Sequence, residues 1–445
     1  MSSFEDPYAD IFDPRTYRDG VPYAAFARLR RESSVVRVAE PEVMGWPAGP
    51  GYWAVLAHAD VKAVLRDATR FSSQLGGTQI RDPRTETDLA FVRRMMLNLD
   101  PPEHSRLRSL MARSFTPRAV AVLETTIRRR ASALIDEVAD RGEADLAAVA
   151  ADLPLLTLAD VMGVPAQDRL LLYDWSNRVI GYQDAEYAAS DAFDAYDADA
   201  ATPMARAAMA ARGTLPQPRP DERPVDPRSR AALGDMFAYA NALAAEKRAH
   251  PGDDVFSILL HAGESGEPGV TDDELENMFF LFAVAGNETL RNGIPGAIHS
   301  LLTHPDQLDR LRAEPALITT AVEESLRYWP PVIHFRRTAT EALELGGQPI
   351  AAGDKVVVYH ASANRDDAVF AVPDEFDIAR SPNDHVSFGH GPHFCLGAHL
   401  ARMQMRAFVG EVVARLDALT LAGEAERLQS NFQNGIKHLP VRWRA

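Results

Sequence analysis

The hydrophobic residues of this 445-residue chain recur mostly at helical spacing. Alanine, leucine and valine repeat with a period near 3.6 over residues 117–190, which predicts successive helices there. We expect those helices to break at Gly142, at Pro154 and at 163–165, where glycine and proline interrupt the period. Short stretches nearer both ends of the chain have the composition of strands. The pattern therefore predicts a mainly α protein with a smaller β part.

The longest predicted helix begins after Thr271 and runs to about Thr303. Thr271 and Glu274 have the spacing of a capping box, and at 1.5 Å per residue the helix is roughly 48 Å long. Residues 278–285 are apolar on every side, and a helix without a polar face is a buried one. Pro295 lies inside the helix and is expected to kink or loosen one turn.

The buried helix carries an acid and a hydroxyl in its middle, Glu288 and Thr289. Burying polar groups is costly unless they have partners. One interpretation is structural, with Thr289 bonding back to a carbonyl one turn earlier and Glu288 pairing with Arg291 or another base. The pattern alone favours this interpretation over a catalytic one.

The remaining predicted elements are short. Short helices are predicted over 23–31, 58–66 and 323–327 and after Pro102. Short strands are predicted over 35–38, 52–55 and 331–338. A hairpin is predicted within 343–360, and a turn between two strands over 431–437.

The segment 190–230 is rich first in alanine and then in proline, and we expect no regular helix in it. It is too long for a routine connection. A functional lid and a solvated linker are equally good interpretations, and low backbone order at 212–228 would favour the linker.

The formal charge is 47 − 63 = −16, which argues against nucleic acid as a partner. A single cysteine excludes an internal disulfide and fits a reducing compartment. The polar, acidic start lacks the features of a signal peptide, and no apolar run is long enough to anchor the chain in a membrane. We therefore expect a cytoplasmic protein, with residues 1–445 forming a single domain.

The lone cysteine, Cys395, lies in the glycine-rich segment 387–397, directly before a helical pattern. A cysteine at a helix start is favoured as the thiolate by the helix dipole and the free amides. A lone thiolate suits one axial bond to a metal held by another group, such as haem iron. Without further context, a small buried hydrophobic side chain is the commoner role of a lone cysteine.

Two further motifs have simple interpretations of their own. His104 and Arg108 follow Asp100-Pro101-Pro102 and share one helix face, which on its own indicates a solvated surface. Glu324 and Arg327 have the spacing of an exposed helical ion pair, which contributes little to stability.

Taken together, three motifs resemble those of the bacterial soluble cytochromes P450. They are Phe388-Gly389-x-Gly391-x-His393-x-Cys395-x-Gly397, Asp100-Pro101-Pro102-x-His104-x-x-x-Arg108 and Ala285-Gly286-x-Glu288-Thr289. The resemblance covers most of residues 98–400. It implies the cytochrome P450 fold, with haem b between the long central helix and the helix after the cysteine loop.

The resemblance also implies a role for each matching residue. Cys395 is the metal ligand, Phe388 packs near its sulfur, and Gly286 makes room for dioxygen. Thr289 and Glu288 are the catalytic pair that delivers protons during oxygen activation. The haem propionates are contacted by His104, Arg108, His393 and Arg337, with Arg336 as the alternative register to Arg337. Glu324, Arg327 and Arg380 form a structural network, and the substrate pocket includes Val284, Ala285, Val332, Ile333 and Phe432.

The implied function is that of a monooxygenase that hydroxylates a hydrophobic small molecule of terpenoid, branched fatty-acyl or steroid-like type. One oxygen atom of O2 enters the substrate, and the electrons come from a ferredoxin with an NAD(P)H-dependent reductase. The resemblance also favours a monomer, and a basic docking patch is expected at Arg113, Arg402 and Arg406. The alternatives are a peroxide-driven enzyme of the same family and a non-catalytic haem-binding sensor.

Overall fold

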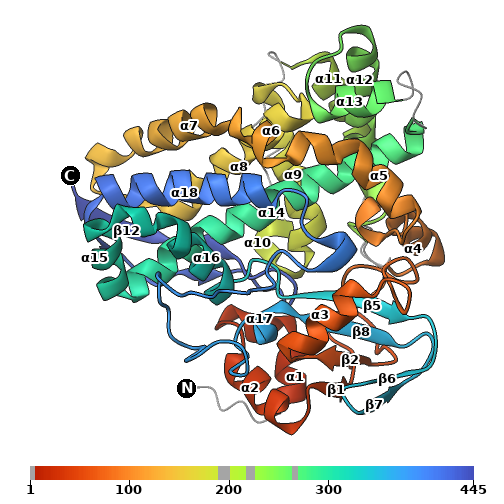
Figure 1. Ribbon diagram of the computed structural model, residues 1–445. Helices are drawn as coiled ribbons and strands as arrows, with labels where there is room; N and C mark the ends of the chain where they lie inside the picture. The colour runs from red at the N-terminus through yellow and green to blue at the C-terminus, as the bar shows by residue number, and fades with distance from the viewer. Residues whose placement is uncertain (1–5, 189–200, 217–225, 263–268) are drawn as a thin grey trace. The chain divides into compact units, whose positions relative to one another are not determined.

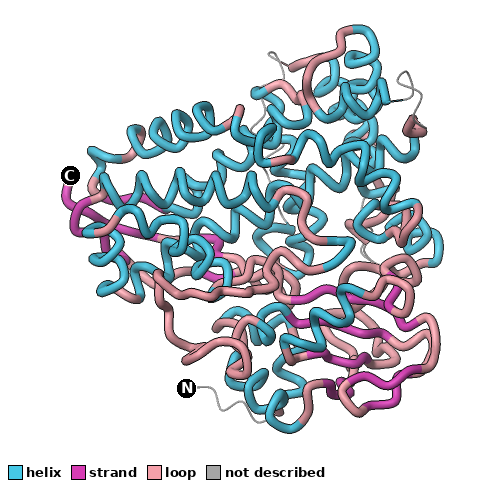
Figure 2. The backbone as a smooth tube through the Cα atoms, in the orientation of Figure 1, coloured by secondary structure: helices cyan, strands magenta, loops and turns pink. Residues whose placement is uncertain are grey.

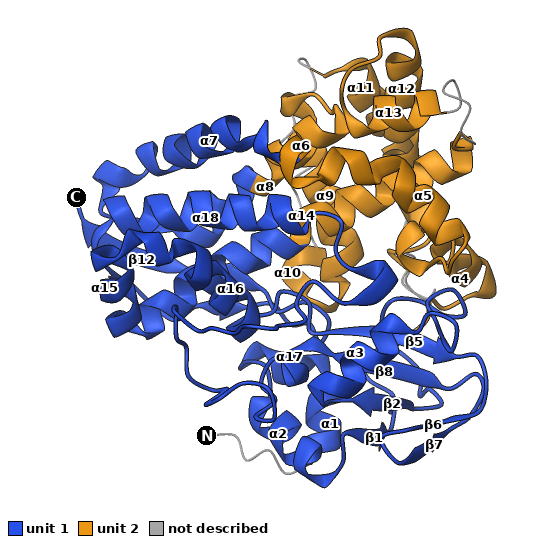
Figure 3. Cartoon of the chain, in the orientation of Figure 1, with its two compact units in different colours: residues 1–81, 120–153, 289–445 blue, residues 82–119, 154–288 orange. Residues whose placement is uncertain are grey.

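The computed structural model describes residues 6–188, 201–216, 226–262 and 269–445. Within these ranges it confirms a mainly α protein with smaller β sheets, as Figure 2 shows. The chain forms two compact units (Figure 3). Unit 1 comprises residues 1–81, 120–153 and 289–445, and unit 2 comprises 82–119 and 154–288.

All the strands that the described residues form belong to unit 1. They are β1 (Val35–Val38), β2 (Tyr52–Val55), β3 (Phe71–Ser72), β4 (Glu143–Asp145), β5 (His334–Ala339), β6 (Leu343–Leu345), β7 (Gln348–Ile350), β8 (Lys355–Tyr359), β9 (Asp417–Leu421), β10 (Glu426–Arg427), β11 (Ile436–His438) and β12 (Pro440–Arg444). The helices wholly within unit 1 are α1 (Pro7–Phe12), α2 (Tyr23–Glu32), α3 (His58–Arg66), α7 (Glu124–Asp136), α15 (Pro305–Ala313), α16 (Ile318–Tyr328), α17 (His360–Ala363) and α18 (Ala398–Arg415).

The described residues of unit 2 form helices and connecting loops, and no strands. Its helices are α4 (Glu86–Val92), α5 (Glu103–Ala112), α9 (Arg169–Ile180), α10 (Ala185–Ala188), α11 (Pro203–Arg212), α12 (Gly234–Ala249) and α13 (Val255–His261). Three helices cross a boundary between the units along the chain: α6 (Pro117–Ala121), α8 (Leu146–Met162) and α14 (Asp272–Thr303).

The main sheet of unit 1 has the strand order β1-β2-β8-β5-β3 (Figure 1). Only the β2–β8 pair is parallel, and the other neighbours are antiparallel. All five residues of β8 are buried, as expected for a central strand that is covered on both faces. One face packs on α1 and α2 through Val357 and Tyr359, and the other packs on α3 through Val356 and Val358.

Helix α14 runs continuously over 32 residues, through Pro295. Its start is a reciprocal capping box, because the Thr271 amide donates to Glu274 Oε2 at 2.8 Å and the Glu274 amide donates to Thr271 Oγ1 at 3.2 Å. The sequence therefore predicted both the start and the length of this helix correctly.

Two sequence predictions are wrong. The first placed a break at Pro154, but α8 continues through it from Leu146 to Met162. Leu153, Leu155 and Leu158 are buried on either side of the proline, so tertiary packing on both turns offsets the hydrogen bond that proline cannot donate.

The second wrong prediction denied a regular helix to residues 190–230, where α11 spans Pro203–Arg212. Thr202 caps this helix by accepting a bond from the Ala205 amide at 3.0 Å, and proline at its first position is favourable because no intrahelical N–H is lost there. Helix α11 packs along α12. Residues 189–200 and 217–225 lie outside the described part of the chain, so the lid and linker interpretations of that segment stay predictions.

Candidate active site

The cysteine loop of unit 1, residues 387–397, presents Cys395 as an exposed thiol. The Cys395 amide donates to the Phe388 carbonyl at 2.8 Å, and α18 begins three residues later at Ala398. Gly391 has φ +71° and lies so close to α3 that an added Cβ would be 2.5 Å from the Leu65 carbonyl oxygen. The loop therefore requires glycine there. Its exposed sulfur does not fit the role of a small buried hydrophobic residue.

Hydrogen bonds tie this loop to the body of unit 1. Ser387 Oγ donates to the Leu326 carbonyl of α16 at 2.7 Å, and the Asn364 amide group donates to Ser387 Oγ at 2.7 Å. Asn364 Oδ1 also accepts from the Val386 amide at 2.9 Å. The cysteine is thus presented by a fixed loop. No pattern in the sequence predicted that Asn364 and Ser387 hold the loop.

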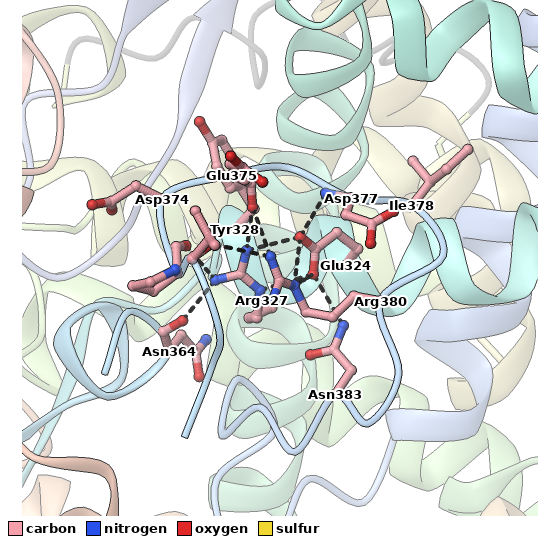
Figure 4. A network of polar contacts seen from close by, with 12 residues as sticks. Glu324, Arg327, Tyr328, Asn364, Asp374, Glu375, Asp377, Ile378, Arg380 and Asn383 are labelled. Carbon is pink, nitrogen blue, oxygen red and sulfur yellow. Dashed lines mark hydrogen bonds and ion pairs between the residues drawn. The ribbon is translucent and has the colours of Figure 1, made fainter. Parts of the chain in front are cut away.

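Figure 4 shows the buried ionic network that supports α16. Glu324 and Arg327 have fully buried side chains and are joined by two 2.8 Å bonds. Arg380 Nε contacts both oxygens of Glu324 at 3.1 Å, and the Asp377 amide donates to Oε1 at 3.0 Å. Arg327 donates to the carbonyls of Asn364, Pro373 and Glu375. Both arginines named from the resemblance therefore bind Glu324, and the buried charges are hydrogen-bonded as burial demands.

Strand register separates the two candidate arginines of β5. Arg337 pairs with Val356 and Arg336 pairs with Val357, and residues directly opposite in an antiparallel pair share a face. Arg337 is therefore on the α3 face of the sheet, where Val386 leads into the cysteine loop.

Arg336 is on the opposite face. Its Nη1 donates to the Ile80 carbonyl at 3.4 Å, and a Cβ added to Gly76 would lie 2.3 Å from its Nη2. Both arginines are buried. This geometry favours Arg337 over Arg336 for a group bound beside the cysteine loop.

His393 lies in the same loop, with Nε2 3.3 Å from Ser73 Oγ. Phe388 lies with its ring centroid 6.2 Å from that of Phe394. Ser73 follows β3, and no motif in the sequence pointed to it.

The candidate pocket residues of unit 1 lie in two segments that hydrogen-bond to each other. The Ile333 amide donates to the Phe432 carbonyl at 2.8 Å, and Val332 and Gln433 form an isolated antiparallel β-bridge. All three candidates are buried, and Ile333 belongs to the core cluster between the main sheet and the N-terminal helices. Their role in a pocket stays a prediction.

In unit 2, α14 brings Glu288 against α9. The Ser176 hydroxyl donates to Glu288 Oε2 at 3.1 Å, and both side chains are fully buried. The structural interpretation of the sequence paired Glu288 with Arg291 or another base, and it did not indicate Ser176, which lies 112 residues away. Thr289 follows directly as the first α14 residue assigned to unit 1.

Several residues in this stretch of α14 are more exposed to solvent than the rest of the helix around them. Ala285 is exposed, and Val284, Gly286 and Thr289 are half-buried, whereas Asn287 and Glu288 are buried. A Cβ added to Gly286 would lie 2.8 Å from Leu158 Cδ1, so the close packing of α8 is one reason for glycine at this position.

Helix α5 of unit 2 carries His104 and Arg108 one turn apart. His104 is buried and Arg108 is half-buried, so the pair is not a fully solvated surface.

Within the described ranges, no group of three or more His, Cys, Asp and Glu side chains has the arrangement of a metal site. In the same ranges, no helix has the length and apolar character needed to cross a membrane.

Comparisons with known proteins agree on one family. The family model described as Cytochrome P450 matches residues 38–441. The chain is 37% identical to a linalool 8-monooxygenase of Pseudomonas putida, over 97% of this chain and 98% of that protein. It is 38% identical to a methyl-branched lipid omega-hydroxylase of Mycobacterium tuberculosis, with coverages of 99% and 96%. It is also 35% identical to a steroid C26-monooxygenase of Rhodococcus jostii, with coverages of 97% and 84%.

Solved structures give the same result. A Mycobacterium marinum cytochrome P450 in complex with pseudoionone is 34% identical and superposes with a TM-score of 0.80, covering 95% of this chain and 94% of that one.

Proposed function

The chain belongs to the cytochrome P450 family and is a monooxygenase, and we propose that Cys395 is the thiolate ligand of its haem b. The observation that carries the proposal is an exposed cysteine on a loop fixed at both of its ends, next to the start of α18. Exposure makes the sulfur available to a metal, and the helix start favours its ionised form.

Haem, when bound, supplies dioxygen binding and the cleavage of the O–O bond. The chain supplies the side chains that hold it. We assign Arg337 and His393 of unit 1, and His104 and Arg108 of unit 2, to the haem propionates. Arginine suits this task because its planar fork donates two parallel hydrogen bonds to one carboxylate.

We assign proton delivery to Glu288 and Thr289. A carboxyl group can give a proton and regain it, and a neighbouring hydroxyl can pass it on. Ser176 holds one oxygen of Glu288 and so restricts the orientations of its carboxyl group.

The proposed substrate is a hydrophobic small molecule. The relatives are named for linalool, methyl-branched lipids and steroids, and the side chains of Val332, Ile333 and Phe432 are apolar and buried. The proposal is therefore a hydroxylase for terpenoid, branched fatty-acyl or steroid-like compounds.

Electrons are proposed to come from a separate ferredoxin with its NAD(P)H-dependent reductase, since a chain with one cysteine cannot ligate an iron–sulfur cluster of its own. We place Arg406 and Arg113 on the docking surface. Arg402 is less suited than the sequence suggested, because Glu323 already binds its guanidinium. The enzyme is proposed to act as a cytoplasmic monomer.

The proposal is tested by titrating the haem-loaded protein with linalool, a methyl-branched fatty acid and a C27 steroid. We expect at least one of them to shift the ferric haem spectrum toward high spin and to be hydroxylated when ferredoxin, reductase and NAD(P)H are supplied. Turnover with hydrogen peroxide and none with ferredoxin would support the peroxide-driven alternative. Spectral binding without any product under either condition would support the sensor.

A further inference from the structure

Glu323 of α16 binds a second arginine of unit 1 that has no part in the Glu324 network. Arg402 Nε donates to Glu323 Oε1 at 2.6 Å, and Nη2 donates to Oε2 at 2.8 Å. His385 Nε2 lies 3.1 Å from Oε2. The side chains of Glu323 and Arg402 are each about three-quarters buried, and that of His385 is almost fully buried.

The arginine of this pair lies over the aromatic ring of the cysteine loop. The Arg402 guanidinium carbon is 4.4 Å from the centroid of Phe388, within the range of a cation–π contact. The Phe388 carbonyl accepts the Cys395 amide at 2.8 Å. One aromatic residue thus separates the ion pair from the residue that carries the sulfur.

The ion pair is stable at neutral pH, because Glu323 is ionised there. Burial raises the pKa of Glu323, but the bonds from His385 and Arg402 lower it by more, to about 2. The bidentate geometry restricts the guanidinium to one plane, which a single-point contact would not do.

We propose that Glu323 and Arg402 are positioning residues that hold Phe388 against the cysteine loop and balance each other's charge beside the Cys395 thiolate. The inference rests on the proposed haem ligation. In the paired state the two charges nearly cancel at the sulfur. If one partner loses its charge, the charge of the other is left uncompensated in a partly buried site, where it is weakly screened.

This arrangement predicts the direction in which the haem reduction potential changes when either charge is removed. Reduction adds one electron to the iron–thiolate unit, so a nearby positive charge favours the reduced form and a negative charge opposes it. Glu323→Gln leaves Arg402 uncompensated and should raise the potential. Arg402→Gln leaves Glu323 uncompensated and should lower it. A purely structural role would give shifts in the same direction for both variants, since both break the same contact.

The experiment is a dithionite titration with redox mediators on the haem-loaded parent, the two single variants and the double variant. We expect shifts of opposite sign in the single variants and a potential in the double variant that is closer to the parent than either single variant. Arg415→Gln is the matched control: it breaks ion pairs of the same helix, 13 residues and about 20 Å further along, and should leave the potential unchanged. Arg402→Lys keeps the charge and should stay near the parent.

Shifts of the same sign in both single variants, or no shift in either, would overturn the inference. If one glutamine variant does not fold, the other and Arg402→Lys still decide it, because only loss of charge should move the potential. Failure of the proposed function has a different signature. In that case the parent itself would lack the red-shifted Soret band of a thiolate-ligated, carbon monoxide-bound haem.

Discussion

The hydroxyl of Ser176 on α9 donates a hydrogen bond to the carboxyl of Glu288 on α14 at 3.1 Å, and both side chains are fully buried. This contact gives the acid of the proposed catalytic pair a fixed partner on another helix. Under the proposed function, Ser176 is a positioning residue for proton delivery.

We predict that Ser176→Ala lowers the rate of product formation by about fivefold, since a hydrogen bond of this kind contributes roughly 1 kcal/mol. Glu288→Gln removes the acid itself and should cost about 10²- to 10⁴-fold. The measurements are the rate of product formation at saturating substrate and the product formed per NAD(P)H consumed. Full activity of Ser176→Ala with normal coupling would show that the serine does not orient the acid.

The two arginines of β5 offer a matched pair of variants for haem binding. Arg337 lies on the face of the sheet that packs against α3 and Val386, whereas Arg336 reaches the Ile80 carbonyl on the other face. We predict that Arg337→Ala speeds the loss of haem to apomyoglobin several-fold, because one propionate loses its charged partner. Arg336→Ala should leave haem loss near the parent rate. Faster loss from Arg336→Ala alone would reverse the assignment.

The Glu324 network should contribute strongly to stability. Glu324→Gln leaves the guanidinium of Arg327 buried without its counter-charge, which costs about 3–5 kcal/mol. Glu124→Gln is the control, because it breaks an exposed helical pair with Arg128 and should cost under about 1 kcal/mol. The free energies of unfolding come from urea titrations of the holoenzyme followed by tryptophan fluorescence. Equal losses in the free energy of unfolding for the two variants would contradict a strong contribution of the buried network to stability.

Three histidines of unit 1, two fully buried and one half-buried, predict a loss of stability at acidic pH. Burial lowers the pKa of His334 from 6.5 to about 3, and it lowers those of His299 and His360 to about 4. The folded state therefore favours the neutral imidazoles. Above pH 6.5 the histidines are neutral in the unfolded state as well, so folding is not opposed by their protonation. Stability is lost as the pH falls from 6.5 toward 4, by about 1.4 kcal/mol per pH unit for each group.

Urea unfolding at intervals between pH 7.5 and 5 measures this slope. His299→Gln should reduce the slope by the share of one group, because glutamine does not titrate. A parent whose stability is flat across this range would contradict the neutral burial of these histidines.

The sequence predicted the local features of this protein well. The capping box at Thr271 and Glu274 and the helix start after the cysteine loop depend on residues a few positions apart, and both are present. The prediction failed where packing overrides local preference, as at Pro154 within α8. It also failed at α11, where Thr202 and Pro203 were an unrecognised start signal.

The contacts around the candidate site could not be predicted, because they join residues distant in the sequence. Ser176 reaches Glu288 across 112 positions, and Arg402 reaches Glu323 across 79. Neither Ser176 nor Glu323 belongs to one of the three family motifs, and a serine or a glutamate on a helix has many possible neighbours. Only the fold selects one.

Ligation of haem iron by Cys395 is the claim on which the others depend. The direct measurement is the absorption spectrum of the reduced, carbon monoxide-bound protein and of its Cys395→Ala variant. We predict the red-shifted Soret band of thiolate ligation in the parent and its complete loss in the variant. A parent without that band, or a variant that keeps it, would contradict the assignment of Cys395.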